Sequence, residues 1–182
     1  REMLRLSSRL MTLFALGLDL PSDYFEQYID RSPSALRAVN YPAQTTAPRP
    51  GQLRAGAHTD YGTLTILRQD DAPGGLEVRS PHDQRWVPIP SIPDAFVVNV
   101  GDLLARWTND RWRSTLHRVV NPDIGATRAS RRQSMPFFHN ANYDSVVACL
   151  PTCLGRGEQP KYPPVTAGVH LMTKFKRTVE TP

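Results

Sequence analysis

Two histidines and one aspartate in this chain have the residue types of a metal site. His58 and Asp60 lie two residues apart within the sequence HTDYG, and His117 lies far along the chain within LHRVVNP. Two imidazoles and one carboxylate hold a metal while leaving three coordination positions open, an arrangement that suits Fe(II) and its reaction with dioxygen. These residues therefore indicate oxygen activation at a non-haem iron.

The spacing of the three residues sets requirements on the elements that carry them. Side chains two apart on an extended strand point to the same side, so His58 and Asp60 can share one metal while Thr59 faces away. His117 must then come from a distant strand that returns beside the first, as in a closed double-sheet roll. A His-x-Asp tripeptide often arises by chance, so its significance depends on the segments around it.

A later segment predicts a binding site for a carboxylate. The sequence RQSMPFF has four residues at alternate positions, which share one face of a strand: Arg132, Ser134, Pro136 and Phe138. An arginine fork binds a carboxylate through two parallel hydrogen bonds, and a serine hydroxyl can donate another. This face indicates a pocket with an anion-binding end beside the metal.

Four motifs occur in the same order as in a known family. The sequences HTDYGTLT, NVGDLL, LHRVVNP and RQSMPFF begin at residues 58, 99, 116 and 132. Together they resemble the iron- and 2-oxoglutarate-dependent dioxygenases of the isopenicillin N synthase-like superfamily. The resemblance extends from about residue 36 to residue 140, and four motifs in order are far more specific than one.

The resemblance implies a role for each matching residue. His58, Asp60 and His117 would be the iron ligands and the catalytic centre. Arg132 and Ser134 would hold the distal carboxylate of the co-substrate 2-oxoglutarate, and Tyr41, in the sequence NYP, is a third candidate for that carboxylate. The implied reaction uses dioxygen, converts 2-oxoglutarate to succinate and carbon dioxide, and hydroxylates, desaturates or cyclises a small molecule.

Two residues are weighed as substrate contacts. Arg37 has the same strand parity as Tyr41 and either meets an acidic substrate or is an ordinary solvated charge. Phe138 is either a pocket wall or a core residue, and these roles are compatible. The remaining histidines, His82, His139 and His170, are interpreted as surface or core residues.

The sequence predicts a mainly β fold with flanking helices and a double-stranded β-helix, or jelly-roll, core. We expect residues 1–182 to form one catalytic domain that lacks the N-terminal region of related full-length enzymes. Flanking helices cover about residues 1–30, the roll covers 35–148 and a terminal helix covers 166–179. The first helix is expected over 2–17, and a second begins near Ser22, whose hydroxyl can cap it. The expected strands are 35–41, 53–58, 63–69, 76–79, 86–89, 96–100, 114–120, 132–139 and 146–148.

Composition fits this organisation. The chain has 182 residues, of which 40% are hydrophobic and 21% charged, enough for one domain with a sizeable core. Its 17 prolines and 11 glycines favour short strands joined by many turns over a helical bundle. Neither a membrane-spanning segment nor a secretory signal is apparent, so we expect a cytoplasmic enzyme.

Charge does not single out a macromolecular partner. The formal net charge is +5, but the basic residues are scattered and no aromatic platform accompanies them, so we expect no nucleic-acid binding. A modest positive field also attracts small dianions such as 2-oxoglutarate. The two cysteines lack the second pair of a zinc site and are expected to be free thiols. The sequence does not indicate the oligomeric state.

Two alternatives stay open beside the 2-oxoglutarate-dependent dioxygenase. The sequence RQSMPFF also resembles the anion-binding strand of isopenicillin N synthase, an oxidase in which the arginine and serine bind a substrate carboxylate and no 2-oxoglutarate is used. More distantly, the three ligands could hold a structural or sensing metal in a non-catalytic jelly-roll protein. Structural zinc sites are usually closed by four protein ligands, which favours the catalytic interpretations.

Overall fold

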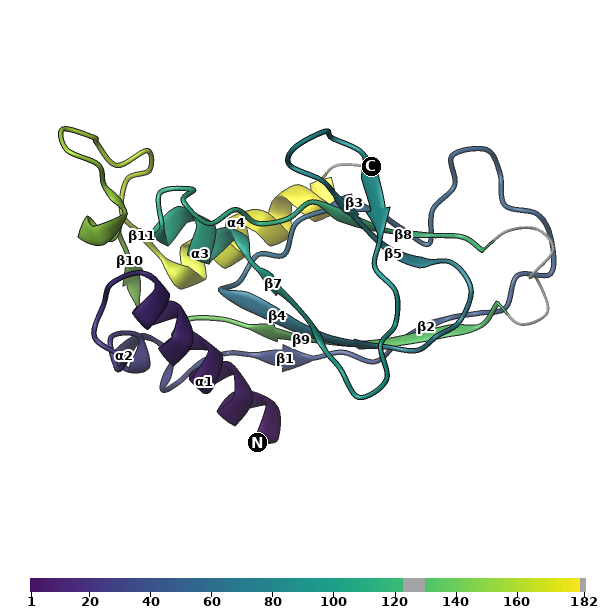
Figure 1. The fold of residues 1–182 in the computed structure, drawn as a ribbon, viewed down its shortest axis with the longest axis horizontal. Helices are drawn as coiled ribbons and strands as arrows, with labels where there is room; N and C mark the ends of the chain where they lie inside the picture. The colour runs from purple at the N-terminus through teal and green to yellow at the C-terminus, as the bar shows by residue number, and fades with distance from the viewer. Residues whose placement is uncertain (123–129, 181–182) are drawn as a thin grey trace.

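A computed structural model of the chain describes residues 1–122 and 130–180. Two antiparallel sheets form the body of the structure, with helices gathered at one end and over one face (Figure 1). The sheets face each other, because a single cavity is lined by side chains from both. The fold is thus the predicted jelly roll with flanking helices.

The larger sheet is built around one long strand. β9 (Arg132–His139) pairs with β4 (Leu64–Gln69), which pairs in turn with β7 (Val97–Val100). On its other side β9 pairs with β1 (Ala35–Leu36) and β2 (Val39–Tyr41). The strand predicted over 35–41 is interrupted opposite Pro136, whose backbone nitrogen has no hydrogen to donate, although Pro136 O still accepts from Arg37 N at 3.0 Å.

The smaller sheet carries the histidines. Its order is β3 (Ala55–His58), β8 (His117–Val120), β5 (Gly75–Arg79) and β6 (Trp86–Pro88). The register of β3 against β8 shifts between Ala55 and His58, so three steps on β3 match two steps on β8. Such a bulge changes the direction of the side chain that follows it, here His58.

The hydrophobic core lies between the larger sheet and the helices. Alternate residues of β4, Leu64 and Ile66, are buried against α1 (Glu2–Gly17), α2 (Glu26–Ile29) and α3 (Asp102–Trp107). Thr65 and Leu67, on the opposite face of β4, line the cavity inside the roll. Helix residues that complete this core are Met11, Ala15, Leu18, Phe25, Ile29, Leu103, Leu104 and Trp107.

The C-terminal part adds a small hairpin and a helix. β10 (Val146–Val147) pairs with β11 (Val165–Thr166), and the 3-10 helix η2 (Pro151–Cys153) lies between them in the chain. α4 (Ala167–Glu180) follows directly and passes α3 (Figure 1). No helix of the described ranges is long and apolar enough to cross a membrane.

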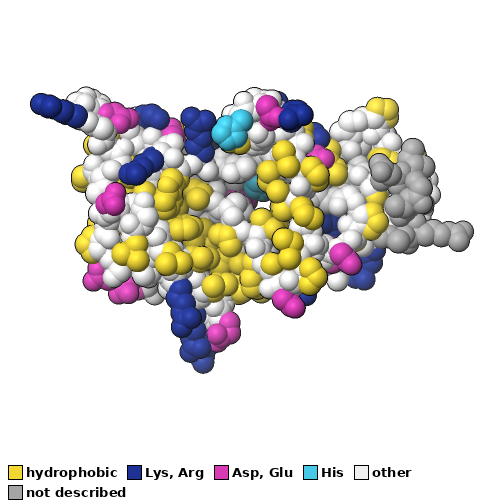
Figure 2. All heavy atoms as spheres, viewed as in Figure 1, with side chains coloured by type: hydrophobic (Ala, Val, Ile, Leu, Met, Phe, Trp, Pro, Cys, Tyr) yellow, Lys and Arg dark blue, Asp and Glu magenta, His cyan; other side chains and the backbone are white. Residues whose placement is uncertain are grey.

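Figure 2 shows hydrophobic side chains gathered across one face of the molecule, with a hollow beside them.

The second predicted helix begins later than expected. Residues 22–25 form turns, and α2 starts at Glu26 with Phe25 as its N-cap and no side-chain capping bond. The prediction that Ser22 caps the helix is therefore wrong. Instead, backbone N–H groups here donate hydrogen bonds to the carbonyl group three residues earlier, as Glu26 N does to Asp23 O at 2.9 Å.

Two glycines hold the segment after β3 against its neighbours. A Cβ atom on Gly62 would overlap the carbonyl oxygen of His139, and a Cβ on Gly101 would overlap the carbonyl oxygen of Gly62. We expect Gly62→Ala to lower the free energy of unfolding by about 1–3 kcal/mol, the usual cost of overpacking. Urea unfolding measures this loss.

Gly56→Ala is the matched control, because a Cβ at Gly56 would meet no atom of the described residues within 4 Å. Its free energy of unfolding should change by no more than about 0.5 kcal/mol. Equal stability of the two variants would contradict the close packing at Gly62.

Candidate metal centre and adjoining cavity

Strand pairing brings the two histidines together. His58 is the last residue of β3 and His117 is the first of β8, and the two are direct cross-strand partners. Their ring centroids lie 4.3 Å apart. The expectation that the strand of His117 returns beside the strand of His58 is confirmed.

The backbone fixes which nitrogen of each imidazole faces inward. His58 Nδ1 lies 2.7 Å from the carbonyl oxygen of Gly56, and His117 Nδ1 lies 2.9 Å from that of Thr115. A carbonyl only accepts, so Nδ1 carries the proton in both rings and donates it. The Nε2 lone pairs are then free to bind a metal.

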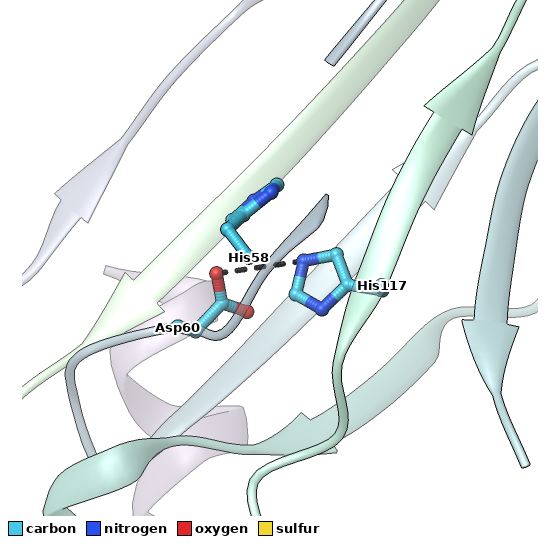
Figure 3. Close-up of side chains that lie close together, drawn as sticks. All are labelled: His58, Asp60 and His117. Atoms are coloured by element: carbon cyan, nitrogen blue, oxygen red, sulfur yellow. Dashed lines mark ion pairs between the residues drawn. The ribbon is translucent and has the colours of Figure 1, made fainter. Parts of the chain in front are cut away.

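Asp60 completes the cluster from the segment after the strand. β3 ends at His58, so Asp60 does not lie on the same strand as the sequence reasoning assumed. Its Oδ1 lies 3.8 Å from His117 Nε2 (Figure 3). Its Oδ2 accepts a hydrogen bond of 2.7 Å from Asn99 Nδ2. Because Asn99 occupies one oxygen, the other is directed toward the imidazoles.

The three residues form the one cluster in the described part of the chain with metal-ligating geometry. Candidate ligand atoms of His58, Asp60 and His117 all lie within 4.8 Å of one another. Two neutral nitrogens and one carboxylate oxygen fit Fe(II), and they leave coordination positions open for small ligands.

A cavity of about 150 Å³ lies between the sheets beside this cluster. All four residues predicted to share one face of β9 line it, which confirms the parity assigned to that strand. Apolar side chains form much of the wall: Val39, Leu67, Leu76, Val78, Val97, Val119, Pro136 and Phe138. The metal cluster therefore opens into a largely apolar chamber.

Arg132 supplies a buried positive charge to that chamber. Its side chain is fully buried, and its Nη2 donates to Gln69 Oε1 at 2.8 Å. Its Nη1 is buried and has no hydrogen-bond partner among the described residues. Burial lowers the pKa of Arg132, while Tyr41 and Asp70 favour the charged form. An unpaired buried donor costs about 1–3 kcal/mol, so this atom is suited to an anionic ligand.

The other predicted site residues surround this arginine. Ser134 and Tyr41 line the same cavity, and the guanidinium of Arg132 lies 5.3 Å from the centre of the Tyr41 ring. Arg37 is exposed at the cavity wall, with its guanidinium 5.5 Å from the Phe138 ring. The structure thus brings every predicted site residue to one cavity.

Two supporting residues were not identified as such from the sequence. Asn99 belongs to the NVGDLL motif, so its place in that motif was the available signal. Gln69 orients Arg132 from the neighbouring strand, and no local pattern marks it. Both act through tertiary contacts.

The remaining histidines lie away from the cluster. His139 is buried on the face of β9 opposite to Arg132, and its Nδ1 lies 2.7 Å from the hydroxyl oxygen of Thr63. His170 Nε2 lies 3.1 Å from the carbonyl oxygen of Tyr61, and His82 is exposed. This placement supports the interpretation of all three as core or surface residues.

Comparison with known proteins defines the family. The model of the 2OG-Fe(II) oxygenase superfamily matches residues 33–141. With the jelly roll and the His-Asp-His cluster in place, the chain belongs to the 2OG-Fe(II) oxygenase superfamily.

Individual relatives agree with that assignment. The chain is 38% identical over 174 residues to the 2-oxoglutarate-Fe(II) type oxidoreductase hxnY of Emericella nidulans, which covers 95% of this chain and 48% of the relative. It is 39% identical over 173 residues to homoarginine-6-hydroxylase 2-ODD-233 of Oryza sativa, covering 93% of this chain and 51% of the relative. The chain spans about half the length of these curated relatives.

A solved structure shows the same fold. A full-length Neurospora crassa protein in complex with alpha-KG superimposes with a TM-score of 0.90 at 36% identity, covering 97% of this chain and 54% of that one. The same Neurospora protein has also been solved with alpha-KG and thymine, at a TM-score of 0.89.

The buried His139 gives the metal-free protein a specific pH dependence. Burial lowers the pKa of His139 from 6.5 to about 4. Between these values the unfolded chain takes up a proton that the folded protein does not bind, so stability falls as the pH falls. At about 1.4 kcal/mol per pH unit, the contribution of His139 to the free energy of unfolding should decrease by about 3 kcal/mol from pH 6.5 to pH 4.

Urea unfolding of wild type and His139→Asn across this range isolates the contribution, because other titrating groups are common to both proteins. The stability advantage of wild type should shrink as the pH falls. An advantage that stays constant from pH 6.5 to pH 4 would contradict a neutral, buried His139.

Proposed function

We propose that this protein is a dioxygenase that uses Fe(II), dioxygen and 2-oxoglutarate to hydroxylate, desaturate or cyclise a small molecule. One observation carries the proposal: the His58, Asp60 and His117 cluster shares a cavity with a buried arginine nitrogen that has no hydrogen-bond partner in the described part of the chain. The cavity thus offers a metal site for the keto-acid end of a 2-oxo diacid and a separate carboxylate site for its other end. The family and the alpha-KG complex of the Neurospora protein support the same interpretation.

The protein would position the co-substrate through β9 and β2. Arg132 Nη1 would donate to the distal carboxylate, with the Ser134 hydroxyl beside it and Tyr41 as a third partner. Because this end of the cavity is buried, the attraction between guanidinium and carboxylate is stronger than it would be in water. The ordered arginine also directs the keto-acid end of the molecule toward the metal cluster.

The bound iron would supply the redox chemistry. Four electrons reduce dioxygen: two come from 2-oxoglutarate as it loses carbon dioxide and becomes succinate, and two come from the substrate. In a hydroxylation the second oxygen atom enters the product, whereas in a desaturation or cyclisation it leaves as water. Apolar side chains of the cavity wall would surround the reacting part of the substrate, while the exposed His58 marks the side of the cluster that faces solvent.

A small molecule is the substrate class that the cavity supports. Arg37 and Phe138 at its wall are candidate substrate contacts, and the Neurospora protein has been solved in complex with thymine. A cytoplasmic location and the absence of nucleic-acid binding stay predictions.

Removal of a metal ligand tests the proposal most simply. Wild type, incubated with Fe(II), dioxygen and carboxyl-labelled 2-oxoglutarate, should release labelled carbon dioxide and form succinate, and a panel of small molecules including thymine should be screened for stimulation. His117→Ala should abolish both products, because the two ligands that remain, His58 and Asp60, are too few to hold the metal. His82→Ala, a change of an exposed histidine, is the control and should retain wild-type turnover.

Full turnover by His117→Ala would overturn the proposal. Oxygen consumption with a competent substrate but without labelled carbon dioxide would favour the oxidase that takes all its electrons from substrate. Stoichiometric zinc without iron-dependent oxygen consumption would favour a non-catalytic metal protein.

Arg132 is tested by co-substrate affinity. Hydrogen bonds to charged groups contribute about 1.5–3 kcal/mol, so Arg132→Leu should raise the dissociation constant for 2-oxoglutarate about 10- to 100-fold. Isothermal titration of the anaerobic Fe(II)-loaded protein measures this. Arg131→Leu alters the neighbouring exposed arginine, which bonds Asn40 at the surface, and should leave the affinity unchanged. Equal affinities in the two variants would contradict the role of Arg132.

A further inference from the structure

The segment that carries Asp60 lies outside the sheet ladders. Residues 59–62, here termed the metal loop, follow the end of β3. Carbonyl groups of the loop accept from the first turn of α3: Asp60 O from Asp102 N at 2.7 Å, and Gly62 O from Leu103 N at 3.0 Å. The position of the Asp60 carboxylate therefore depends on contacts that hold the loop from outside the sheet.

A series of side-chain contacts connects α4 to this loop. Lys174 Nζ of α4 lies 2.6 Å from Asp102 Oδ2, and the same oxygen accepts a hydrogen bond of 3.0 Å from Thr59 Oγ1. The side chains of Lys174 and Asp102 are only 30% and 12% exposed. Partial burial and a shared oxygen make this contact stronger and better ordered than a surface ion pair. Thr59 in turn lies between His58 and Asp60.

A second set of contacts joins α4 to the same loop. His170 lies 3.1 Å from the carbonyl oxygen of Tyr61 through its Nε2. Burial lowers the pKa of His170, which favours the neutral ring with Nε2–H as donor. The Tyr61 ring packs edge-on against Phe175 with centroids 5.5 Å apart, and its hydroxyl bonds Thr178 Oγ1. Three turns of α4 thus contact one residue of the loop.

We propose that α4 is a brace for the metal loop, and that Lys174 and Asp102 are positioning residues for Asp60 that act through Thr59. This inference rests on the proposed function only in taking the cluster as a metal site. Neither Lys174 nor Thr59 touches the cavity, so their effect reaches the metal through loop geometry alone. Loosening the brace lets the Asp60 carboxylate sample positions that do not bind metal, and the metal affinity falls.

The test is the affinity of the purified protein for Co(II), an oxygen-stable substitute for Fe(II), followed by its visible absorption. Lys174→Ala should raise the dissociation constant about 3- to 10-fold, less than the 10- to 100-fold usual for groups bonded directly to a metal ligand. Lys174→Arg, which keeps the charge, should recover most of the affinity. Lys176→Ala is the matched control, because Lys176 is exposed on the same helix, and it should bind like wild type.

Two further measurements separate bracing from general loss of structure. Thermal unfolding without metal should show that Lys174→Ala is folded at the temperature of the binding measurement, with an unfolding temperature somewhat below that of Lys176→Ala because a partly buried ion pair is lost. In a double-mutant cycle, Lys174→Ala should weaken Co(II) binding far less in a Thr59→Val protein than in wild type, because both changes break the same series of contacts. Additive effects would overturn the route through Thr59.

The outcomes distinguish this inference from the proposed function. Wild type that fails to bind Co(II) at the cluster, shown by an unchanged affinity in His117→Ala, would overturn the metal site itself. Wild-type binding that is lost in His117→Ala but unchanged in Lys174→Ala would overturn the brace and leave the proposed function intact.

Discussion

The antiparallel pairing of β3 with β8 is the constraint on which the site depends. It puts His58 directly opposite His117 and leaves each Nδ1 bonded to a carbonyl two residues earlier in the chain. The imidazoles are therefore oriented by backbone hydrogen bonds that their own segments provide. The bulge in β3 and the irregular segment after His58 then bring Asp60 to the same point, and Asn99 holds its Oδ2.

The second condition for function is the contrast between the two faces of the larger sheet. One face of β4 and β9 packs against helices and forms the core, and the other lines the cavity. This alternation buries Arg132 in the roll with one nitrogen unpaired among the described residues, an unfavourable arrangement unless an anion completes it. Gly75 contributes by leaving space, since a Cβ there would lie 3.3 Å from Arg132 Nε. The cost in folding stability of burying Arg132 with an unpaired nitrogen is consistent with a binding site at this residue.

Local patterns were sufficient to predict much of this arrangement. The four-residue spacing of apolar residues gave α1 with its observed bounds, and strand parity placed Arg132, Ser134, Pro136 and Phe138 on one face. Features set by tertiary contacts were not predictable in the same way. The short helix α3 was not among the predicted elements, and it forms because Leu103, Leu104 and Trp107 are buried in the core that they share with α1 and α2. The link from Lys174 to Thr59 joins residues more than a hundred positions apart, so no spacing rule indicates it.

The most direct test of the account is a crystal structure of the protein loaded anaerobically with Fe(II) and 2-oxoglutarate. We expect the iron on Nε2 of His58, Nε2 of His117 and one carboxylate oxygen of Asp60, with the distal carboxylate of 2-oxoglutarate bonded to Arg132 Nη1. A metal bound through either Nδ1 or away from these residues would contradict the account. So would a co-substrate whose distal carboxylate points away from Arg132.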